Sequence, residues 1–213
     1  MSEPLVLGFD TSAACCAGAL LSGGRIVAER SEPMQRGQAE RLIPLLEGLL
    51  CDAGVRWSDL SALGAGIGPG NFTGIRISVA TARGLALSLG IPTVGVSAFE
   101  ALRHGADGVV VASVRGPGDT LYIQVTGDVP QQCRPDTLPP VPPQGTPTVI
   151  GHRADEIAQH YGGRAAHPAC SLPEAIARIA ARRRSDAPPR PAPLYIRAAS
   201  AAPPRRPPPV IAG

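Results

Sequence analysis

The order of the predicted elements indicates an α/β fold, in which a mixed sheet carries helices. Residues 5–30 contain three apolar, strand-like segments separated by turns. Residues 38–53 and 75–89 repeat apolar residues with helical spacing, and a short apolar segment at 62–67 separates them. Hairpin-linked strands followed by a helix, a strand and a helix give the order βββαβα, which packs as a sheet covered by helices.

The first half of the chain is clearly delimited. Segments 5–11, 15–21 and 25–30 are predicted strands, and the glycines after Ser22 form the second turn. The predicted helix 38–53 aligns several leucines on one stripe, with Pro44 inside the pattern. The strand 62–67 leads into the helix 75–89, which ends at Gly90. A fifth strand at 92–96 and a short helix at 98–104 follow.

The second half is less regular. Strands are predicted at 108–114, 120–127 and 148–151, and helices at 155–160 and 173–184. The stretch 129–147 holds seven prolines and is predicted to be a loop. The tail from Pro188 holds nine prolines and is expected to be extended or disordered.

Composition excludes several classes of enzyme. All 20 basic residues among the 213 are arginines, so a P-loop lysine, a kinase strand lysine and a Schiff base are impossible. Twelve of these arginines lie beyond residue 104, which indicates either contact with nucleic-acid phosphates or a solvated tail. Five cysteines without a C-x-x-C pair argue against a disulfide framework, and four histidines lack zinc-site spacing. We expect no metal site and a cytoplasmic location, because no leader or long apolar run is present.

The most informative segment is the decamer 68–77, which joins a buried strand to a helix. The unpaired N–H groups at a helix start attract anions, and glycines also let another backbone come close. Asn71 or Thr73 is expected to cap the helix. The candidate loop residues are Gly68, Pro69, Gly70, Asn71, Phe72, Thr73, Gly74 and Arg76.

The two long helices are candidates for a protein interface. The second carries small residues at i, i+4 spacing on two stripes, and the first carries more leucine than one face requires. The alternative is that both helices are buried within this chain. The candidate interface residues are Leu42, Leu45, Leu46, Leu49, Ile75, Ser78, Val79, Ala82 and Ala86.

A carboxylate follows the first predicted strand, in the sequence Asp10, Thr11 and Ser12. It is either a degenerate phosphate-site residue or the cap of a turn, and we favour the turn. Arg76 lies in the first turn of its helix, where a cation opposes the helix dipole. That position indicates an anionic partner, with Asp10 and Glu40 as the candidates.

The decamer resembles the hallmark of the TsaB (YeaZ) family, which usually has Ser at the position of Asn71. Segments 7–12, 38–46, 94–102 and 193–197 are also similar to this family. The chain departs from the family pattern at Gly37, where His is common, and at the degraded turn 114–122. The resemblance covers residues 5–104 well and the remainder loosely.

The resemblance implies an actin, sugar-kinase and heat-shock-ATPase fold, which is ribonuclease H-like. It implies a complete first domain over residues 1–104 and a reduced second domain over residues 105–213. It implies a non-catalytic scaffold that activates a TsaD-type catalytic subunit, which modifies the tRNA adenosine next to the anticodon. A TsaE-type ATPase is a further partner, and tRNA contact is indirect. ATP and metal are expected on the catalytic subunit, with no cofactor in this chain. In the absence of its partner, the chain is expected to form a homodimer. No association with a membrane is expected.

Two rival functions remain open from the sequence. One is a small-molecule kinase or ATPase of the same fold, and the other is a tRNA-binding module that uses the arginine-rich tail. A hydrolase finds no support, because the segment 95–99 lacks the final glycine of a nucleophile elbow.

Overall fold

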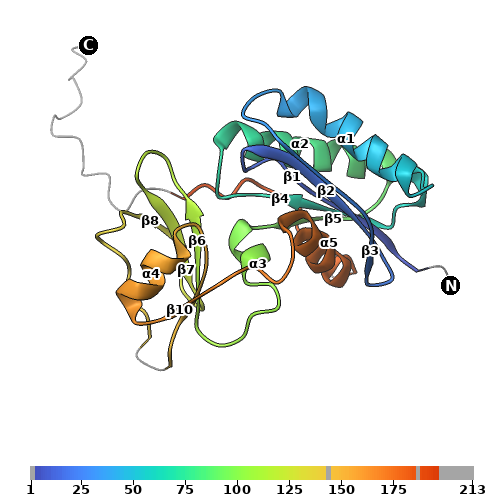
Figure 1. The fold of residues 1–213 in the computed structure, drawn as a ribbon. Coiled ribbons are helices and arrows are strands. Elements are labelled where there is room, and N and C mark those ends of the chain that lie inside the picture. Colours follow the sequence, from blue (N-terminus) through green and yellow to red (C-terminus); the bar gives the residue numbers. More distant parts are fainter. Residues whose placement is uncertain (1–2, 143–144, 186–187, 197–213) are drawn as a thin grey trace, which may run out of the picture.

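The computed structural model describes residues 3–142, 145–185 and 188–196, and it shows two lobes, each built on a five-stranded sheet (Figure 1). The strand order of the first sheet is β3-β2-β1-β4-β5. Strands β1, β2 and β3 are antiparallel neighbours, while β4 and β5 run parallel to β1. The strands are β1 (Leu5–Asp10), β2 (Cys15–Ser22), β3 (Arg25–Pro33), β4 (Ala62–Gly66) and β5 (Thr93–Val96).

Helices cover both faces of the first sheet. Figure 1 shows α1 and α2 together on one face and α5 with α3 on the other. The first face holds a leucine-rich core around Leu7 and Phe9, whereas Val6, which points to the opposite face of β1, packs with the α5 side. The helices are α1 (Gln38–Asp52), α2 (Phe72–Leu89), α3 (Ala98–Leu102) and α5 (Leu172–Arg183).

The second lobe repeats the strand arrangement of the first. Its order is β10-β9-β6-β7-β8, with β6, β7 and β8 antiparallel and with β9 and β10 parallel to β6. It is reduced in strand length and in helices, not in strand order. Its elements are β6 (Val110–Arg115), β7 (Leu121–Val125), β8 (Gln131–Cys133), β9 (Thr148–Gly151), α4 (Ala154–Tyr161) and β10 (Arg164–Ala166).

Most predicted elements are present, with four differences. The stretch 129–147 is not entirely a loop, because β8 pairs with β7 at its start. Strand β10 and the 3-10 helix Trp57–Asp59 were not expected from the sequence. Helix α2 begins at Phe72 rather than at residue 75, because the side chain of Asn71 caps it there.

The expected domain division at residue 104 does not hold for α5. This helix lies in the second half of the sequence, but it packs against β1, β2 and β4 of the first sheet. The chain therefore crosses to the second lobe and returns. No helix in the described part of the chain is long and apolar enough to cross a membrane.

Candidate functional site

The decamer loop packs tightly against the loop that follows β1. The Asn71 amide N–H donates to the Ser12 carbonyl oxygen at 2.7 Å, and the Thr11 hydroxyl donates to the Gly74 carbonyl oxygen at 2.7 Å. A side chain at Gly70 would overlap the Ser12 carbonyl oxygen, and one at Gly74 would overlap that of Thr11. The glycines therefore admit another backbone of the same chain, which is one of the two alternatives that the sequence left open.

The loop also starts α2. The Asn71 side-chain oxygen accepts the Gly74 amide N–H at 3.0 Å, so Asn71 is the predicted cap and Thr73 is not. Pro69 and Phe72 complete the loop, and the Phe72 ring is about half exposed. The first residues of α2 therefore have two structural roles, because they follow the end of β4 and hydrogen-bond to the turn between β1 and β2.

Asp10 forms the cap of the turn after β1. It is buried, and one carboxylate oxygen accepts the Ser12 amide N–H at 2.9 Å, the Ser12 hydroxyl at 3.0 Å and the Ala13 amide N–H at 3.3 Å. Burial raises the pKa of Asp10 above its usual value, although these hydrogen bonds act in the opposite direction. The turn geometry accounts for Asp10, Thr11 and Ser12 without a phosphate.

The interface residues chosen from the sequence lie in the core of this chain, which contradicts that assignment. The leucines of α1 pack against the first sheet. The named residues of α2 pack between α2 and the same sheet. Their small and apolar character serves internal packing, so they offer no surface in this conformation. The buried members are Leu42, Leu45, Leu46, Leu49, Ile75, Ser78, Val79 and Ala82, and Ala86 is partly buried against the same core.

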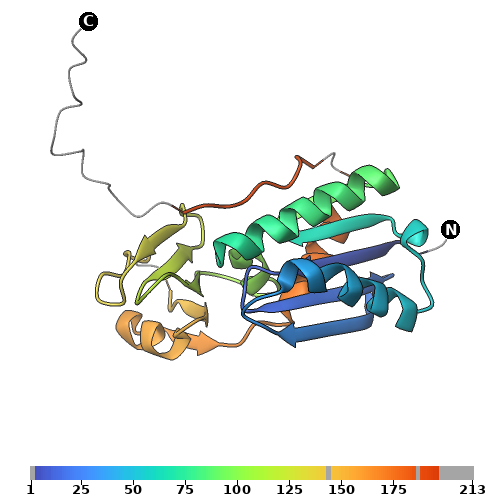
Figure 2. The ribbon, with the colours of Figure 1, turned by 90° about the horizontal axis from the view of Figure 1, so that it is seen from above.

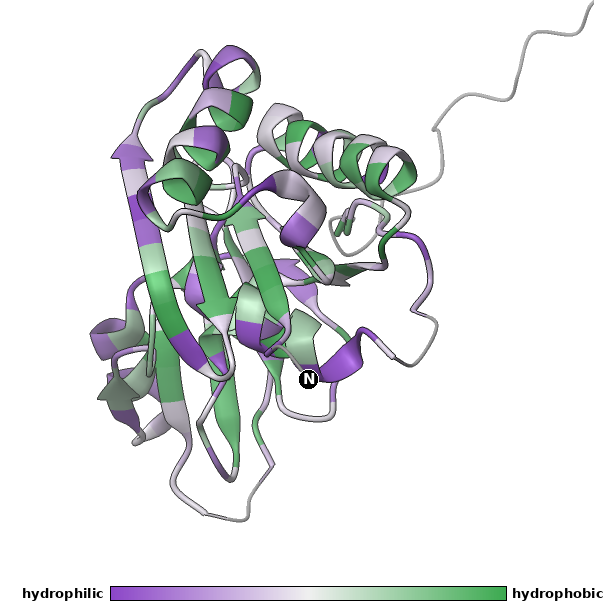
Figure 3. Ribbon diagram, turned by 90° about the vertical axis from the view of Figure 1, so that its right-hand side faces the viewer, coloured by the Kyte–Doolittle hydropathy of each residue, from purple (hydrophilic) through white to green (hydrophobic). Residues whose placement is uncertain are grey.

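The second small stripe of α2 is the one that faces outward. Ala80, Gly84, Leu87 and Ser88 are exposed, and Leu87 has 84% of its surface accessible. Within the described part of the chain, no atom lies within 4 Å of a Cβ built on Gly84. Figure 3 shows α2 in mostly green and pale colours, whereas α1 carries more purple. Arg76 and Arg83 are the charged residues of α2 (Phe72–Leu89), and the outward stripe itself carries none.

Both arginines of α2 hold the C-terminal segment rather than an anion. Figure 2 shows residues 188–196 running alongside α2. Arg83 donates to the Pro191 carbonyl oxygen at 2.8 Å, and Arg76 donates to the Tyr195 hydroxyl at 3.1 Å. The Arg76 guanidinium also lies 3.9 Å from the centre of the Phe72 ring. The expected pairing of Arg76 with Asp10 or Glu40 is wrong.

Tyr195 is a residue whose role sequence reasoning missed. Its ring stacks on that of Phe72 with centroids 5.0 Å apart, although the two residues are more than 120 positions apart in the sequence. The Leu194 amide N–H donates to the Ile67 carbonyl oxygen at 2.8 Å, beside the decamer loop. The only sequence signal was the position of Tyr195 within the segment 193–197, which resembles the family without indicating a contact.

Two other expectations concern metals and the arginine-rich end. Among the described residues, no group of three or more His, Cys, Asp or Glu side chains is arranged to hold a metal ion. Arg183 pairs with Glu100 at 2.7 Å, and Arg178 pairs with Glu174 at 2.8 Å, so these charges are partly neutralised. Arg197, Arg205 and Arg206 lie outside the described residues.

Comparison with known proteins identifies relatives of this fold. A family model described as TsaD, tRNA N6-adenosine threonylcarbamoyltransferase, matches residues 27–128. The tRNA threonylcarbamoyladenosine biosynthesis protein TsaB of Escherichia coli is 37% identical over 101 residues, which are 47% of this chain and 43% of the relative. TsaB of Bacillus subtilis is 34% identical over 62% of this chain and 60% of the relative. The matched regions thus span about half the length of the curated relatives.

Solved structures agree over nearly the whole chain. A Pseudomonas aeruginosa protein described as uncharacterized, with similarity to peptidase YEAZ, superposes with a TM-score of 0.70 and 25% identity. The superposition covers 91% of this chain and all of the other. The two sheets and their helices are those of the actin, sugar-kinase and heat-shock-ATPase fold. With the decamer and its contacts to the β1–β2 loop in place, the chain is similar in sequence and in fold to proteins of the TsaB (YeaZ) family.

Proposed function

We propose that this protein is a non-catalytic scaffold that binds and activates a TsaD-type catalytic subunit in the threonylcarbamoyladenosine modification of tRNA. The similarity to TsaB proteins supports a role in threonylcarbamoyladenosine synthesis, since these curated relatives are named for that process. ATP and metal bind the partner in this proposal, a TsaE-type ATPase joins the complex, and tRNA contact is indirect.

The observation that carries the proposal is the outward stripe of α2. The exposed Leu87 stands among the small residues Ala80, Gly84 and Ser88, which permit close approach of another helix. This stripe replaces the buried residues that were chosen from the sequence. In the absence of the partner, the same stripe is expected to pair with its copy about a two-fold axis.

The buried carboxylate supports a non-catalytic role for this chain. One carboxylate oxygen of Asp10 accepts hydrogen bonds from three donors of its own turn. A phosphotransferase of this fold needs a carboxylate that faces the phosphates and their Mg²⁺. The rival kinase or ATPase therefore gains no specific support from the site.

Co-expression with the TsaD-type subunit of the same organism tests the scaffold. Leu87→Asp places a charge at the centre of the proposed contact and is expected to abolish co-purification by size-exclusion chromatography. Val129→Asp is the matched control, because Val129 is 82% exposed but belongs to the second lobe. Far-UV circular dichroism should show both variants folded. Retained co-purification of Leu87→Asp would exclude this surface.

A reconstituted tRNA-modification assay tests the absence of catalysis. The isolated chain is expected to modify no tRNA and to hydrolyse no ATP, while its addition should raise the activity of the catalytic subunit. The reason is differential binding, because a scaffold acts by favouring one conformation of its partner. Turnover of ATP by the purified chain would contradict the proposal.

A further inference from the structure

The segment 188–196 runs alongside α2 as an extended strap (Figure 2), and the proposed scaffold role does not use it. Four of its nine residues are prolines, which lack an N–H group, and it does not pair as a strand. Within the described chain, Leu194 is the strap residue whose amide N–H bonds to another backbone group, the Ile67 carbonyl oxygen, at 2.8 Å. Side chains of α2 make the other hydrogen bonds to the strap.

The two arginines of α2 hold the strap along two turns of the helix. The Arg83 Nε–H donates to the Pro191 carbonyl oxygen at 2.8 Å, and the Arg76 Nε–H donates to the Tyr195 hydroxyl at 3.1 Å. Pro191 is buried, and a Cβ built on Gly95 of β5 would lie 3.3 Å from the Cβ of this proline. The strap therefore has a defined position against both α2 and β5.

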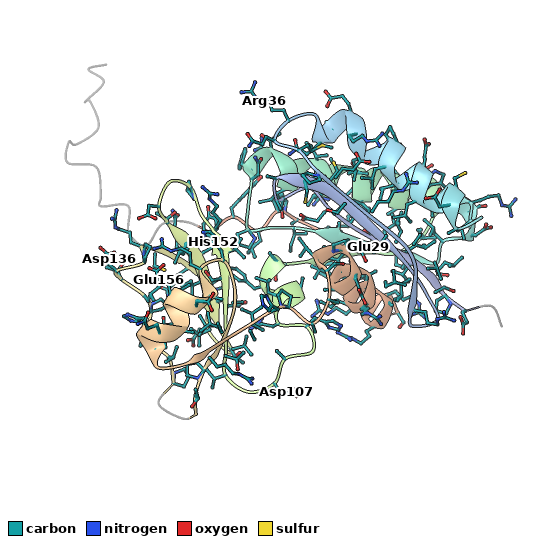
Figure 4. All side chains as sticks on the ribbon, viewed as in Figure 1. Glu29, Arg36, Asp107, Asp136, His152 and Glu156 are labelled. Atoms are coloured by element: carbon teal, nitrogen blue, oxygen red, sulfur yellow. The ribbon has the colours of Figure 1, made fainter. Side chains whose placement is uncertain are left out.

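The strap supplies acceptors that the remainder of the described chain does not. Helix α2 contains no Asp or Glu, and neither Arg76 nor Arg83 forms an ion pair within residues 3–142, 145–185 and 188–196. In the same residues, each of these side chains donates a hydrogen bond to the strap alone. Figure 4 shows Asp107, Asp136 and Glu156 well away from α2. The strap is thus the hydrogen-bond acceptor that orients both guanidinium groups.

Both arginines adjoin the outward stripe of α2. Ala80 lies four residues after Arg76 and three before Arg83, and Leu87 lies four residues after Arg83. Residues three or four positions apart are neighbours on a helix surface. Helical side chains also lean toward the preceding turn, so an Arg83 side chain that loses the strap can cover Ala80.

A guanidinium over the stripe would oppose the docking of a helix there. The docked helix would remove water from the charge, and α2 has no carboxylate to pair with it. Burial of an unpaired charge is costly. When the strap is bound, Arg76 and Arg83 stay exposed at the side of the helix, and the stripe itself remains uncharged.

We propose that the strap is a conformational device that keeps Arg76 and Arg83 off the outward stripe and thereby controls docking at this stripe. Release of the strap lets the two cations move over the stripe and weakens docking. Docking in turn stabilises the bound strap, because such coupling is reciprocal. The strap acts as a positioning segment, without contact to the partner. The inference rests on the proposed function, in which the stripe binds the catalytic subunit.

Dissociation constants for the purified TsaD-type subunit of the same organism test the device. The strap-release variant combines Leu194→Pro, which removes the N–H bonded to Ile67, with Tyr195→Ala, which removes the aromatic stack and the acceptor of Arg76. It is expected to bind the subunit about tenfold more weakly than the wild type. In the isolated variant, the ¹⁵N-labelled Arg83 Nε–H should exchange faster with water, which reports release without the partner.

Removal of the two cations is expected to rescue binding. Arg76→Gln with Arg83→Gln should bind like the wild type, because no cation is left to cover the stripe. The same two substitutions added to the strap-release variant should restore wild-type affinity. A strap that touches the partner, or that only stabilises α2, would leave this combined variant as weak as the strap-release variant, which would overturn the inference.

The remaining outcomes separate this inference from the scaffold. Unchanged affinity, or unchanged Arg83 exchange, in the strap-release variant would overturn the device alone, provided that the wild type binds. A wild-type chain that does not bind the catalytic subunit would contradict the proposed function and this inference together.

Discussion

The decamer glycine Gly74 provides a sharp test of the structural reasoning, because helix propensity and packing predict opposite signs. In α2, replacing glycine by alanine should by propensity alone stabilise the helix by about 1 kcal/mol. A Cβ at Gly74, however, would overlap the Thr11 carbonyl oxygen and lie 2.8 Å from its carbon. Both are backbone atoms, so neither can turn away as the end of a side chain could.

The magnitude follows from what must move. Overpacking against a rigid neighbour costs about 1–3 kcal/mol. Displacing the loop also weakens the Thr11 hydroxyl bond to the Gly74 carbonyl and the Asn71 bond to Ser12, each about 1 kcal/mol. After subtraction of the propensity gain, Gly74→Ala is expected to lower the free energy of unfolding by about 2–4 kcal/mol.

The same substitution at Gly84 is the matched control. Gly84 lies in the same helix, but its Cβ position is open among the described residues, so Gly84→Ala should stabilise the protein by about 0.5–1 kcal/mol. Urea denaturation followed by far-UV circular dichroism measures both variants. If Gly74→Ala proves as stable as the wild type, or shifts its midpoint in the same direction as Gly84→Ala, the packing of the decamer is not as described.

Three further perturbations test the remaining assignments. Ala82→Arg is expected to abolish soluble, folded protein, because Ala82 is fully buried. Ala80→Arg, on the exposed stripe of the same helix, should fold. Equal yields of the two variants would show that the buried and outward faces of α2 are misassigned. Tyr195→Ala is expected to speed amide hydrogen exchange at the start of α2, because it removes an aromatic stack worth about 1 kcal/mol. Tyr195→Phe keeps the stacked ring and should retain most of the protection. Unchanged exchange in Tyr195→Ala would argue against the stack. The raised pKa of Asp10 means that the folded state binds the carboxyl proton more tightly than the unfolded state, so protonation of Asp10 stabilises the fold at low pH, and this stabilisation is lost as the pH rises from 3.8 through the raised pKa. Urea denaturation across that pH range should therefore show a smaller loss of stability in Asp10→Asn than in the wild type. An equal loss in the two proteins would refute the raised pKa of Asp10.

Local patterns in the sequence determined the elements and their order. Hairpin turns, apolar runs and helical spacing are properties of neighbouring residues, so β1 to β5, α1 and α2 were predicted close to their observed bounds. The decamer was also recognisable, because a strand that ends in glycines before a capped helix has a local signature. The weakest local signals were those of β8 and β10, which have three residues each and depend on pairing with β7 and β9.

Only the tertiary structure decided which face of each helix is buried. The two small stripes of α2 have the same spacing, and the position of the sheet makes Ala82 internal and Ala80 external. The return of α5 to the first sheet, the stack of Tyr195 on Phe72 and the bond of Arg83 to Pro191 join segments that are distant in the sequence. Periodicity records that a helix has an apolar side, but burial depends on what the rest of the chain places against it.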